Sequence, residues 1–123
     1  MTKVAPALFY MWTLRTVTDG HPEKIFRILP GNIRTLGRAV GADFIVDAAM
    51  VSRVHCRLTS LADGALEVRD LDSTNGTFVN GQRVETARLA AGDRLQVGRL
   101  ELVASREQAP LPQAAESLTR GDR

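Results

Sequence analysis

Short stretches of alternating apolar and polar residues run along most of the chain. Trp12 and Leu14, for example, alternate with polar neighbours, and a period of two residues is typical of a half-buried strand. No long segment keeps the 3.6-residue period of an amphipathic helix. The pattern therefore predicts an all-β protein, with strands at residues 25–29, 34–38, 44–46, 54–61, 65–71, 78–79, 83–84, 94–97 and 100–102 after the first one.

Turn residues separate these strands at intervals of about 8 to 12 residues, which is typical of an antiparallel sandwich or barrel. The strongest turn signals are Asp63-Gly64 and Asn80-Gly81, because these dipeptides favour two-residue hairpin turns. A helical pattern can be drawn over residues 84–91, but a Gly-Asp pair follows at once and cuts it short. We predict a loop there.

The two ends of the chain lack this pattern. Residues 1–10 are predicted to be a lead-in, residues 11–103 the domain, and residues 104–123 a flexible, disordered C-terminal tail. The apolar run near the N-terminus loosely imitates a signal peptide. Pro6 interrupts that run, however, and no small-residue cleavage site follows, so we expect no secretion.

Composition excludes several classes of protein. With 123 residues, 44% of them hydrophobic and 24% charged, the chain has room for one ordinary globular domain. No apolar run approaches the ~18 residues of a membrane span. The single cysteine, Cys56, excludes a disulfide framework, and with two histidines it is too little for a structural zinc site. We therefore expect no metal, no cofactor and a cytoplasmic location.

Charge and aromatic content argue against nucleic acid as a partner. The formal net charge is +2, which leaves no strong field for a polyanion, and aromatic residues make up 5%. All but two of the 16 basic residues are arginines. The planar guanidinium group suits phosphate and carboxylate, although a GC-rich bacterial genome produces the same bias. We expect neither nucleic acid nor a membrane as a partner.

Three short polar segments fall in predicted loops and carry the chemistry of the chain. They are residues 36–38 (Leu-Gly-Arg), 52–55 (Ser-Arg-Val-His) and 70–77 (Asp-Leu-Asp-Ser-Thr-Asn-Gly-Thr). Together they supply guanidinium groups, hydroxyls, an asparagine and glycines, but no nucleophile with a base beside it. His55 and Cys56 are adjacent, but neighbours in a strand point to opposite faces, so we expect no catalytic pair. This inventory suits a site that holds phosphate without reacting with it.

In this order and at these spacings, the segments resemble the forkhead-associated (FHA) domain, a module that binds phosphothreonine peptides. The likeness runs from about Met11 to Val103 and includes Asn80-Gly81 and the later Gly92 and Gly98. The resemblance implies a sandwich of two twisted, mainly antiparallel sheets, with about eleven strands and the ligand loops at one end.

The resemblance also implies a role for each residue of the site. Arg38 contacts the phosphate, and the hydroxyls of Ser52 and Thr74 donate hydrogen bonds to it. The backbone N–H of Arg53 joins them, while its side chain either adds a second guanidinium or selects an acidic residue downstream. Asn75 holds the peptide main chain. We expect Arg38 to lie exposed, without a structural partner. Four further residues support the loops: Gly37, His55, Gly76 and Asn80.

The function implied is that of an adaptor in serine/threonine kinase signalling and not of an enzyme. Its partner is a threonine-phosphorylated protein or peptide, for example a kinase or its substrate. The alternative is an FHA-like structural assembly domain of a secretion or envelope complex, with no phosphate dependence. The presence of Arg38, Ser52, Thr74 and Asn75 argues against that alternative. We also hypothesise that Thr119 in the tail is phosphorylated and occupies this or a neighbouring copy's site.

Overall fold

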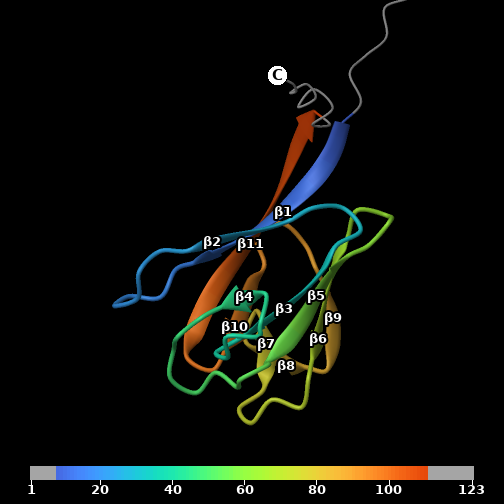
Figure 1. The fold of residues 1–123 in the computed structure, drawn as a ribbon. Coiled ribbons are helices and arrows are strands. Elements are labelled where there is room, and N and C mark those ends of the chain that lie inside the picture. The colour runs from blue at the N-terminus through green and yellow to red at the C-terminus, as the bar shows by residue number, and fades with distance from the viewer. Residues whose placement is uncertain (1–7, 111–123) are drawn as a thin grey trace, which may run out of the picture.

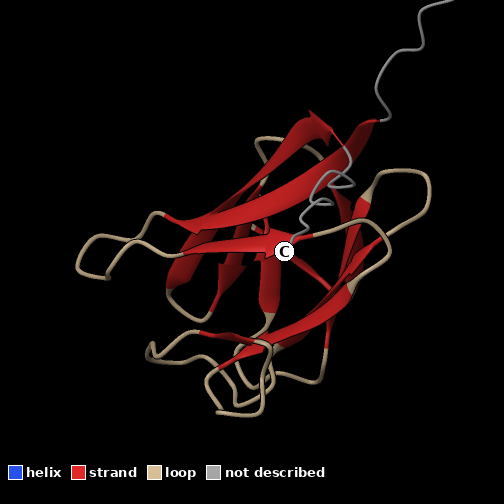
Figure 2. Ribbon diagram, turned by 45° about the horizontal axis from the view of Figure 1, so that its top comes forward, coloured by secondary structure: helices blue, strands red, loops and turns tan. Residues whose placement is uncertain are grey.

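Eleven strands form two sheets packed face to face in the computed structural model, which describes residues 8–110 (Figure 1). No residue of this range is in a helix (Figure 2), so the all-β prediction is confirmed. The strands are β1 (Leu8–Thr16), β2 (Ile25–Ile28), β3 (Ile33–Gly37), β4 (Phe44–Ile45), β5 (Cys56–Ser60), β6 (Leu66–Asp70), β7 (Thr77–Val79), β8 (Gln82–Val84), β9 (Thr86–Leu89), β10 (Arg94–Val97) and β11 (Leu100–Pro110).

The sheets have six and five strands. The larger has the order β2-β1-β11-β10-β7-β8, and the smaller has the order β4-β3-β5-β6-β9. Neighbouring strands pair antiparallel except β3 and β4, which run parallel. The predicted sandwich of two mainly antiparallel sheets is therefore confirmed.

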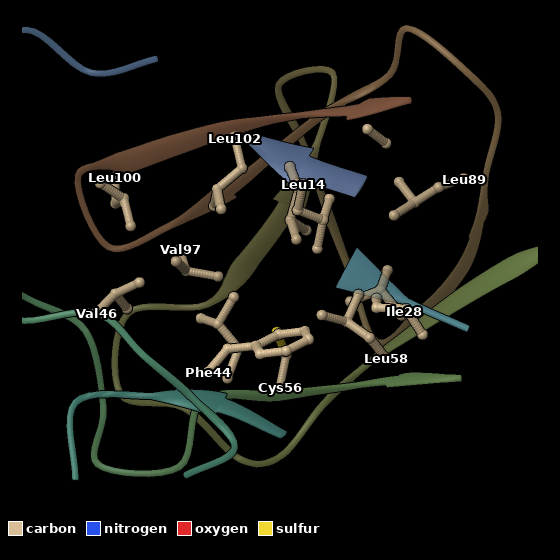
Figure 3. Close-up of a cluster of buried hydrophobic side chains, with 14 of the residues drawn as sticks. Leu14, Ile28, Phe44, Val46, Cys56, Leu58, Leu89, Val97, Leu100 and Leu102 are labelled. Atoms are coloured by element: carbon tan, nitrogen blue, oxygen red, sulfur yellow. The ribbon is translucent and has the colours of Figure 1, made fainter. Parts of the chain in front are cut away.

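Apolar side chains that alternate along the strands fill the space between the sheets (Figure 3). Leu14 and Ile28 of the larger sheet and Leu58 of the smaller one are fully buried. Burial of one such side chain stabilises the fold by about 1.5–3 kcal/mol. At the edge of the sandwich the rings of Phe26 and Phe44 stack with centroids 4.7 Å apart, which joins β2 to β4.

The hairpin predicted at Asn80-Gly81 is present between β7 and β8. Both residues have positive φ, 50° and 85°, as a type I′ turn requires. The loop predicted over residues 84–91 is wrong, because β9 occupies residues 86–89 and β8 ends at Val84. Leu89 points inward and Arg88 outward, but β9 is a short edge strand. Its alternation covers too few residues to stand out in the sequence.

The longest strands extend beyond the predicted domain at both ends. β1 and β11 pair from Leu8 and Pro110 to Thr16 and Leu102. The tail prediction is therefore wrong for residues 104–110, and the lead-in prediction is wrong for residues 8–10. Here β1 and β11 project past the sandwich as a two-stranded ribbon (Figure 1). Residues 105–108 are exposed, so the ribbon needs no apolar alternation there. The rest of the tail, including Thr119, lies outside the described residues.

Strand register brings the polar segments together. Leu36 at the end of β3 lies opposite Cys56 at the start of β5, and Cys56 lies opposite Asp70 at the end of β6. The loops β3–β4, β4–β5 and β6–β7 therefore leave the smaller sheet at the same end.

Candidate functional site

An open cleft lies between the β4–β5 loop, the β6–β7 loop and the start of the β3–β4 loop. All five residues predicted to contact a phosphopeptide line it: Arg38, Ser52, Arg53, Thr74 and Asn75. Asp47 and Asp72 line it as well. Neither aspartate was predicted as a site residue.

Arg38 is anchored at one of its three guanidinium nitrogens. Its Nε donates to the carbonyl of Val51 at 3.1 Å, and its backbone N–H donates to the carbonyl of Ser52 at 3.0 Å. The expectation that Arg38 has no structural partner is wrong, because its side chain folds back over the β4–β5 loop. Within residues 8–110 the two terminal nitrogens have no hydrogen-bond partner, so they are free to act as a fork.

Ser52 and Thr74 connect the two principal loops across the cleft. The hydroxyl oxygen of Ser52 accepts the backbone N–H of Thr74 at 3.0 Å. A hydroxyl that accepts one hydrogen bond still has its proton to donate, and here that proton can point into the cleft. The backbone N–H of Arg53 has no partner among the described residues. The hydroxyl of Thr74 adds a donor on the other side of the cleft.

Asn75 makes a second connection between the same loops. Its side-chain Nδ2 donates to the carbonyl of Met50 at 2.9 Å. The other N–H of this amide and its oxygen remain for a ligand. An asparagine held in this way can pair with the main chain of an extended peptide, which offers one N–H and one carbonyl per residue.

His55 is fully buried beneath the cleft and bridges the loops. Its Nδ1 accepts the backbone N–H of Ser52 at 3.0 Å, and its Nε2 lies 2.8 Å from the carbonyl of Gly76. Because Nδ1 accepts, the ring proton must be on Nε2, which donates to Gly76. One side chain thus satisfies a backbone group in each loop.

A second buried network holds the β6–β7 loop. The carboxylate of Asp70 accepts the hydroxyls of Ser73 and Thr77, both at 2.6 Å, and the hydroxyl oxygen of Ser73 accepts the N–H of Gly76 at 2.9 Å. Desolvation acts to raise the pKa of Asp70, but the hydrogen bonds from Ser73 and Thr77 outweigh it and hold the pKa below its usual value.

Sequence reasoning missed this network. Residues 70–77 were identified as a polar segment, but roles were assigned only to its later members. The available signal was an aspartate followed by hydroxyl residues three and seven positions later, the first of which also donates its backbone N–H to the aspartate (3.2 Å).

The two glycines predicted to support the loops occupy crowded positions. A Cβ on Gly37 would overlap the carbonyl oxygen of Arg53, and one on Gly76, where φ is +91°, would lie 2.9 Å from Nε of Arg83. Asn80 is different, because it does not line the cleft. Its side chain accepts the N–H of Arg94 at 2.9 Å and so ties the β7–β8 turn to β10.

The described residues show no metal-binding cluster. Burial raises the pKa of the Cys56 thiol to about 12, so the thiol stays protonated and unreactive beside His55. Within residues 8–110 no group of three potential metal ligands comes together. No helix in this range is long and apolar enough to cross a membrane. The arrangement of donors in the cleft can hold an anion.

Comparison with known proteins identifies the family. The FHA domain model matches residues 34–98. The ABC transporter ATP-binding/permease protein Rv1747 of Mycobacterium tuberculosis is 43% identical over 74 residues, which cover 60% of this chain and 8% of that protein. The glycogen accumulation regulator GarA of Mycolicibacterium smegmatis is 42% identical over 67 residues, 54% of this chain and 42% of GarA. This chain thus spans less than half the length of these curated relatives.

Solved structures agree with this assignment. The N-terminal FHA domain of Rad53p from S. cerevisiae, in complex with a phosphothreonine peptide, superposes with a TM-score of 0.67 at 26% identity. The match covers 79% of this chain and 94% of that domain.

Proposed function

Because this chain belongs to the FHA domain family, whose members bind phosphothreonine, we propose that its cleft holds a phosphothreonine through Arg38, Ser52 and Thr74. The observation that carries the proposal is the convergence of these three residues on one cleft. Each is fixed by a hydrogen bond to a neighbouring loop that leaves donors unused.

Phosphothreonine matches these donors in number and charge. Its phosphate carries nearly two negative charges at pH 7 and three acceptor oxygens. The free nitrogens of Arg38 can pair with two oxygens at once, while the hydroxyls of Ser52 and Thr74 and the N–H of Arg53 take the remaining positions. Asn75 then pairs with the peptide main chain.

Directed hydrogen bonds, rather than a general positive field, must supply the affinity. Four charged side chains line the cleft, and the two arginines (Arg38 and Arg53) are balanced by the two aspartates (Asp47 and Asp72). Charge-assisted hydrogen bonds contribute about 1.5–3 kcal/mol each. Three or four of them, less the cost of association, correspond to about micromolar affinity.

We propose further that the chain acts as an adaptor without catalytic activity. The cleft offers no nucleophile paired with a base, and GarA, with which this chain shares its FHA region, is named a regulator. Its partner would be a protein phosphorylated on threonine by a serine/threonine kinase, in the cytoplasm.

A degenerate phosphothreonine peptide library, screened beside the same library without phosphate, tests this proposal. We expect enrichment of phosphorylated peptides only. A phosphoserine library should bind more weakly, since it lacks a methyl group whose burial contributes about 0.8 kcal/mol. Equal recovery from the phosphorylated and unphosphorylated libraries would contradict the proposal and favour an assembly domain.

A further inference from the structure

Successive carbonyl groups of the β4–β5 loop hold two of the cleft side chains. The carbonyl of Met50 accepts Nδ2 of Asn75 at 2.9 Å. The carbonyl of Val51 accepts Nε of Arg38 at 3.1 Å, and that of Ser52 accepts the backbone N–H of Arg38 at 3.0 Å. The position of the backbone at residues 50–52 therefore determines where both side chains lie.

This part of the loop rests on a turn that belongs to the other sheet. Gly98 follows β10 in the tight turn that leads to β11, and its φ is +59°. A Cβ at Gly98 would lie 2.6 Å from both the carbonyl carbon and the carbonyl oxygen of Met50, and 3.0 Å from the carbonyl oxygen of Ala49. Real Cβ atoms do not approach backbone atoms this closely, so the loop or the turn would have to move.

The crowding at Gly98 is separate from its backbone conformation. Gly92, in the turn between β9 and β10, also has a positive φ of +93°, but a Cβ there would meet no atom within 4 Å. A positive φ alone is strained for most residues. Gly98 differs from Gly92 in that its missing side chain also makes room for the carbonyl of Met50.

Met50 cannot easily yield to such a displacement. Its own φ is +69°, which is uncommon for a residue other than glycine, and its carbonyl is directed at Asn75. The loop is also held beneath the cleft, where the N–H of Ser52 donates to the buried ring of His55. A shift of Met50 would therefore change the hydrogen bond to Asn75 before it could be absorbed elsewhere.

We infer that Gly98 is a positioning residue for the binding cleft: it touches no ligand, but its lack of a side chain lets the β10–β11 turn support the Met50 carbonyl that orients Asn75. The inference rests on the proposed function, because it concerns affinity for phosphothreonine peptide. It extends the site to the six-stranded sheet, which contributes none of the residues that line the cleft.

The test compares Gly98→Ala with Gly92→Ala, using the tightest phosphothreonine peptide from the library. Both variants should melt at a lower temperature, since both strain a positive φ. Only Gly98→Ala should lose affinity, by about tenfold, which corresponds to about 1.4 kcal/mol. Equal affinities of the two variants would overturn the inference.

Asparagine variants keep the inference testable if the alanine variants do not fold. Asn tolerates a positive φ better than Ala, but it still carries a Cβ. Gly98→Asn should therefore fold and still bind about tenfold more weakly than Gly92→Asn. Wild-type affinity in a folded Gly98→Asn protein would contradict the inference.

A double-mutant cycle with Asn75→Ala separates positioning from general destabilisation. Once the Asn75 amide is gone, Gly98→Ala should cost less affinity than it does in the wild type. Full additivity of the two losses would contradict the inference. The resonances of the Asn75 side-chain amide in the peptide-free protein provide a readout independent of binding. They should move in Gly98→Asn and stay in place in Gly92→Asn, even if no library peptide binds and the proposed function fails.

Discussion

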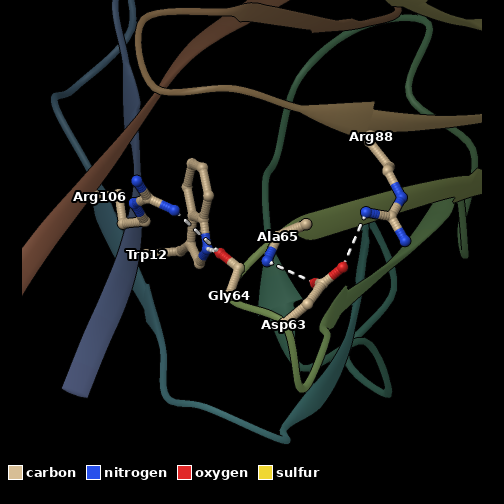
Figure 4. A network of polar contacts seen from close by, with 6 residues as sticks. All are labelled: Trp12, Asp63, Gly64, Ala65, Arg88 and Arg106. Atoms are coloured by element: carbon tan, nitrogen blue, oxygen red, sulfur yellow. Dashed lines mark hydrogen bonds and ion pairs between the residues drawn. The ribbon is translucent and has the colours of Figure 1, made fainter.

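The two ends of the sandwich are held together by different means. At the cleft end, buried polar side chains bond to the loop backbone, as His55 does for Ser52 and Gly76. At the other end, the turn between β5 and β6 is held by exposed charged side chains and by one partly buried hydrogen bond from Trp12 (Figure 4). Buried hydrogen bonds are costly to leave half-made, whereas exposed ones are replaced by water. The cleft end should therefore respond far more strongly to substitution.

The contacts of the far end are one partly buried hydrogen bond and several exposed contacts of charged side chains. Trp12 Nε1 donates to the carbonyl of Gly64 at 3.0 Å, and the guanidinium of Arg106 lies 3.4 Å from the same oxygen. That guanidinium also lies 4.4 Å from the centre of the Tyr10 ring. Arg88 and Asp63 form an ion pair at 2.9 Å in which both side chains are more than half exposed. Such a pair adds little to stability.

The largest effect is expected at His55. The substitution His55→Ala leaves the N–H of Ser52 and the carbonyl of Gly76 without partners, and each buried unsatisfied group costs about 1–3 kcal/mol. The melting temperature and the phosphothreonine-peptide affinity should fall together, as thermal unfolding and isothermal titration would measure. Trp12→Phe at the far end is the matched control: because Trp12 is buried in the core, this variant should also melt at a lower temperature, but it should keep its peptide affinity. A His55→Ala protein with wild-type stability and binding would show that the bridge is dispensable.

An intermediate effect is expected from Arg38→Lys. Lysine keeps the charge but cannot present two parallel N–H groups to the phosphate, so we expect at least about a tenfold loss of affinity by isothermal titration. Lysine also lacks the Nε donor to Val51, so the melting temperature should fall slightly. Arg88→Lys at the far end should change neither. Unchanged affinity of Arg38→Lys would mean that Arg38 acts only as a diffuse charge.

The smallest effect is expected on the free energy of unfolding at acidic pH. The pKa of Asp70 is lowered in the folded state, so the ionised carboxylate stabilises the fold above the unfolded pKa of about 3.9. This contribution is lost as the pH falls through the lower folded-state pKa. Asp70→Asn should therefore flatten the pH dependence of the free energy of unfolding below about pH 4, measured by urea denaturation.

Asp63→Asn is the control for that measurement. The backbone N–H of Ala65 and the guanidinium of Arg88 lower the pKa of Asp63 as well, but this carboxylate is fully exposed and screened by solvent. Its substitution should leave the pH dependence of the free energy of unfolding at acidic pH close to that of the wild type. Identical curves for Asp70→Asn and the wild type would show that the buried network contributes no pH-dependent stability.

The features that could be predicted from the sequence are those that arise from local patterns. Strands such as β5 and β6 follow from local alternation, and the hairpin at Asn80-Gly81 follows from local turn chemistry. The polar segments of the cleft also stand out locally, as runs of residues around Arg38 and Thr74. Strands, turns and polar segments that depend on a few residues adjacent in the sequence could therefore be predicted.

Contacts between distant segments were not predictable in this way. Three such contacts join parts of the chain that only the fold brings together. Val51 anchors Arg38, Met50 anchors Asn75, and Gly98 approaches the β4–β5 loop. The apolar pattern also stops at Ala104, where the β1–β11 ribbon leaves the sandwich, although the strand itself continues. Beyond that point β11 still pairs with β1, but its residues 105–108 are no longer buried. The hydrophobic pattern of a sequence indicates burial and not strand pairing.

The most direct test of the account is an NMR titration of the labelled protein with a phosphothreonine peptide and with its unphosphorylated form. The largest shifts should occur at the backbone amides of Arg38, Ser52, Arg53 and Thr74, with the turn at Asp63 unchanged. The unphosphorylated peptide should shift none of them. Equal shifts with both peptides, or shifts centred on the far end, would contradict the assignment of phosphothreonine binding to this cleft.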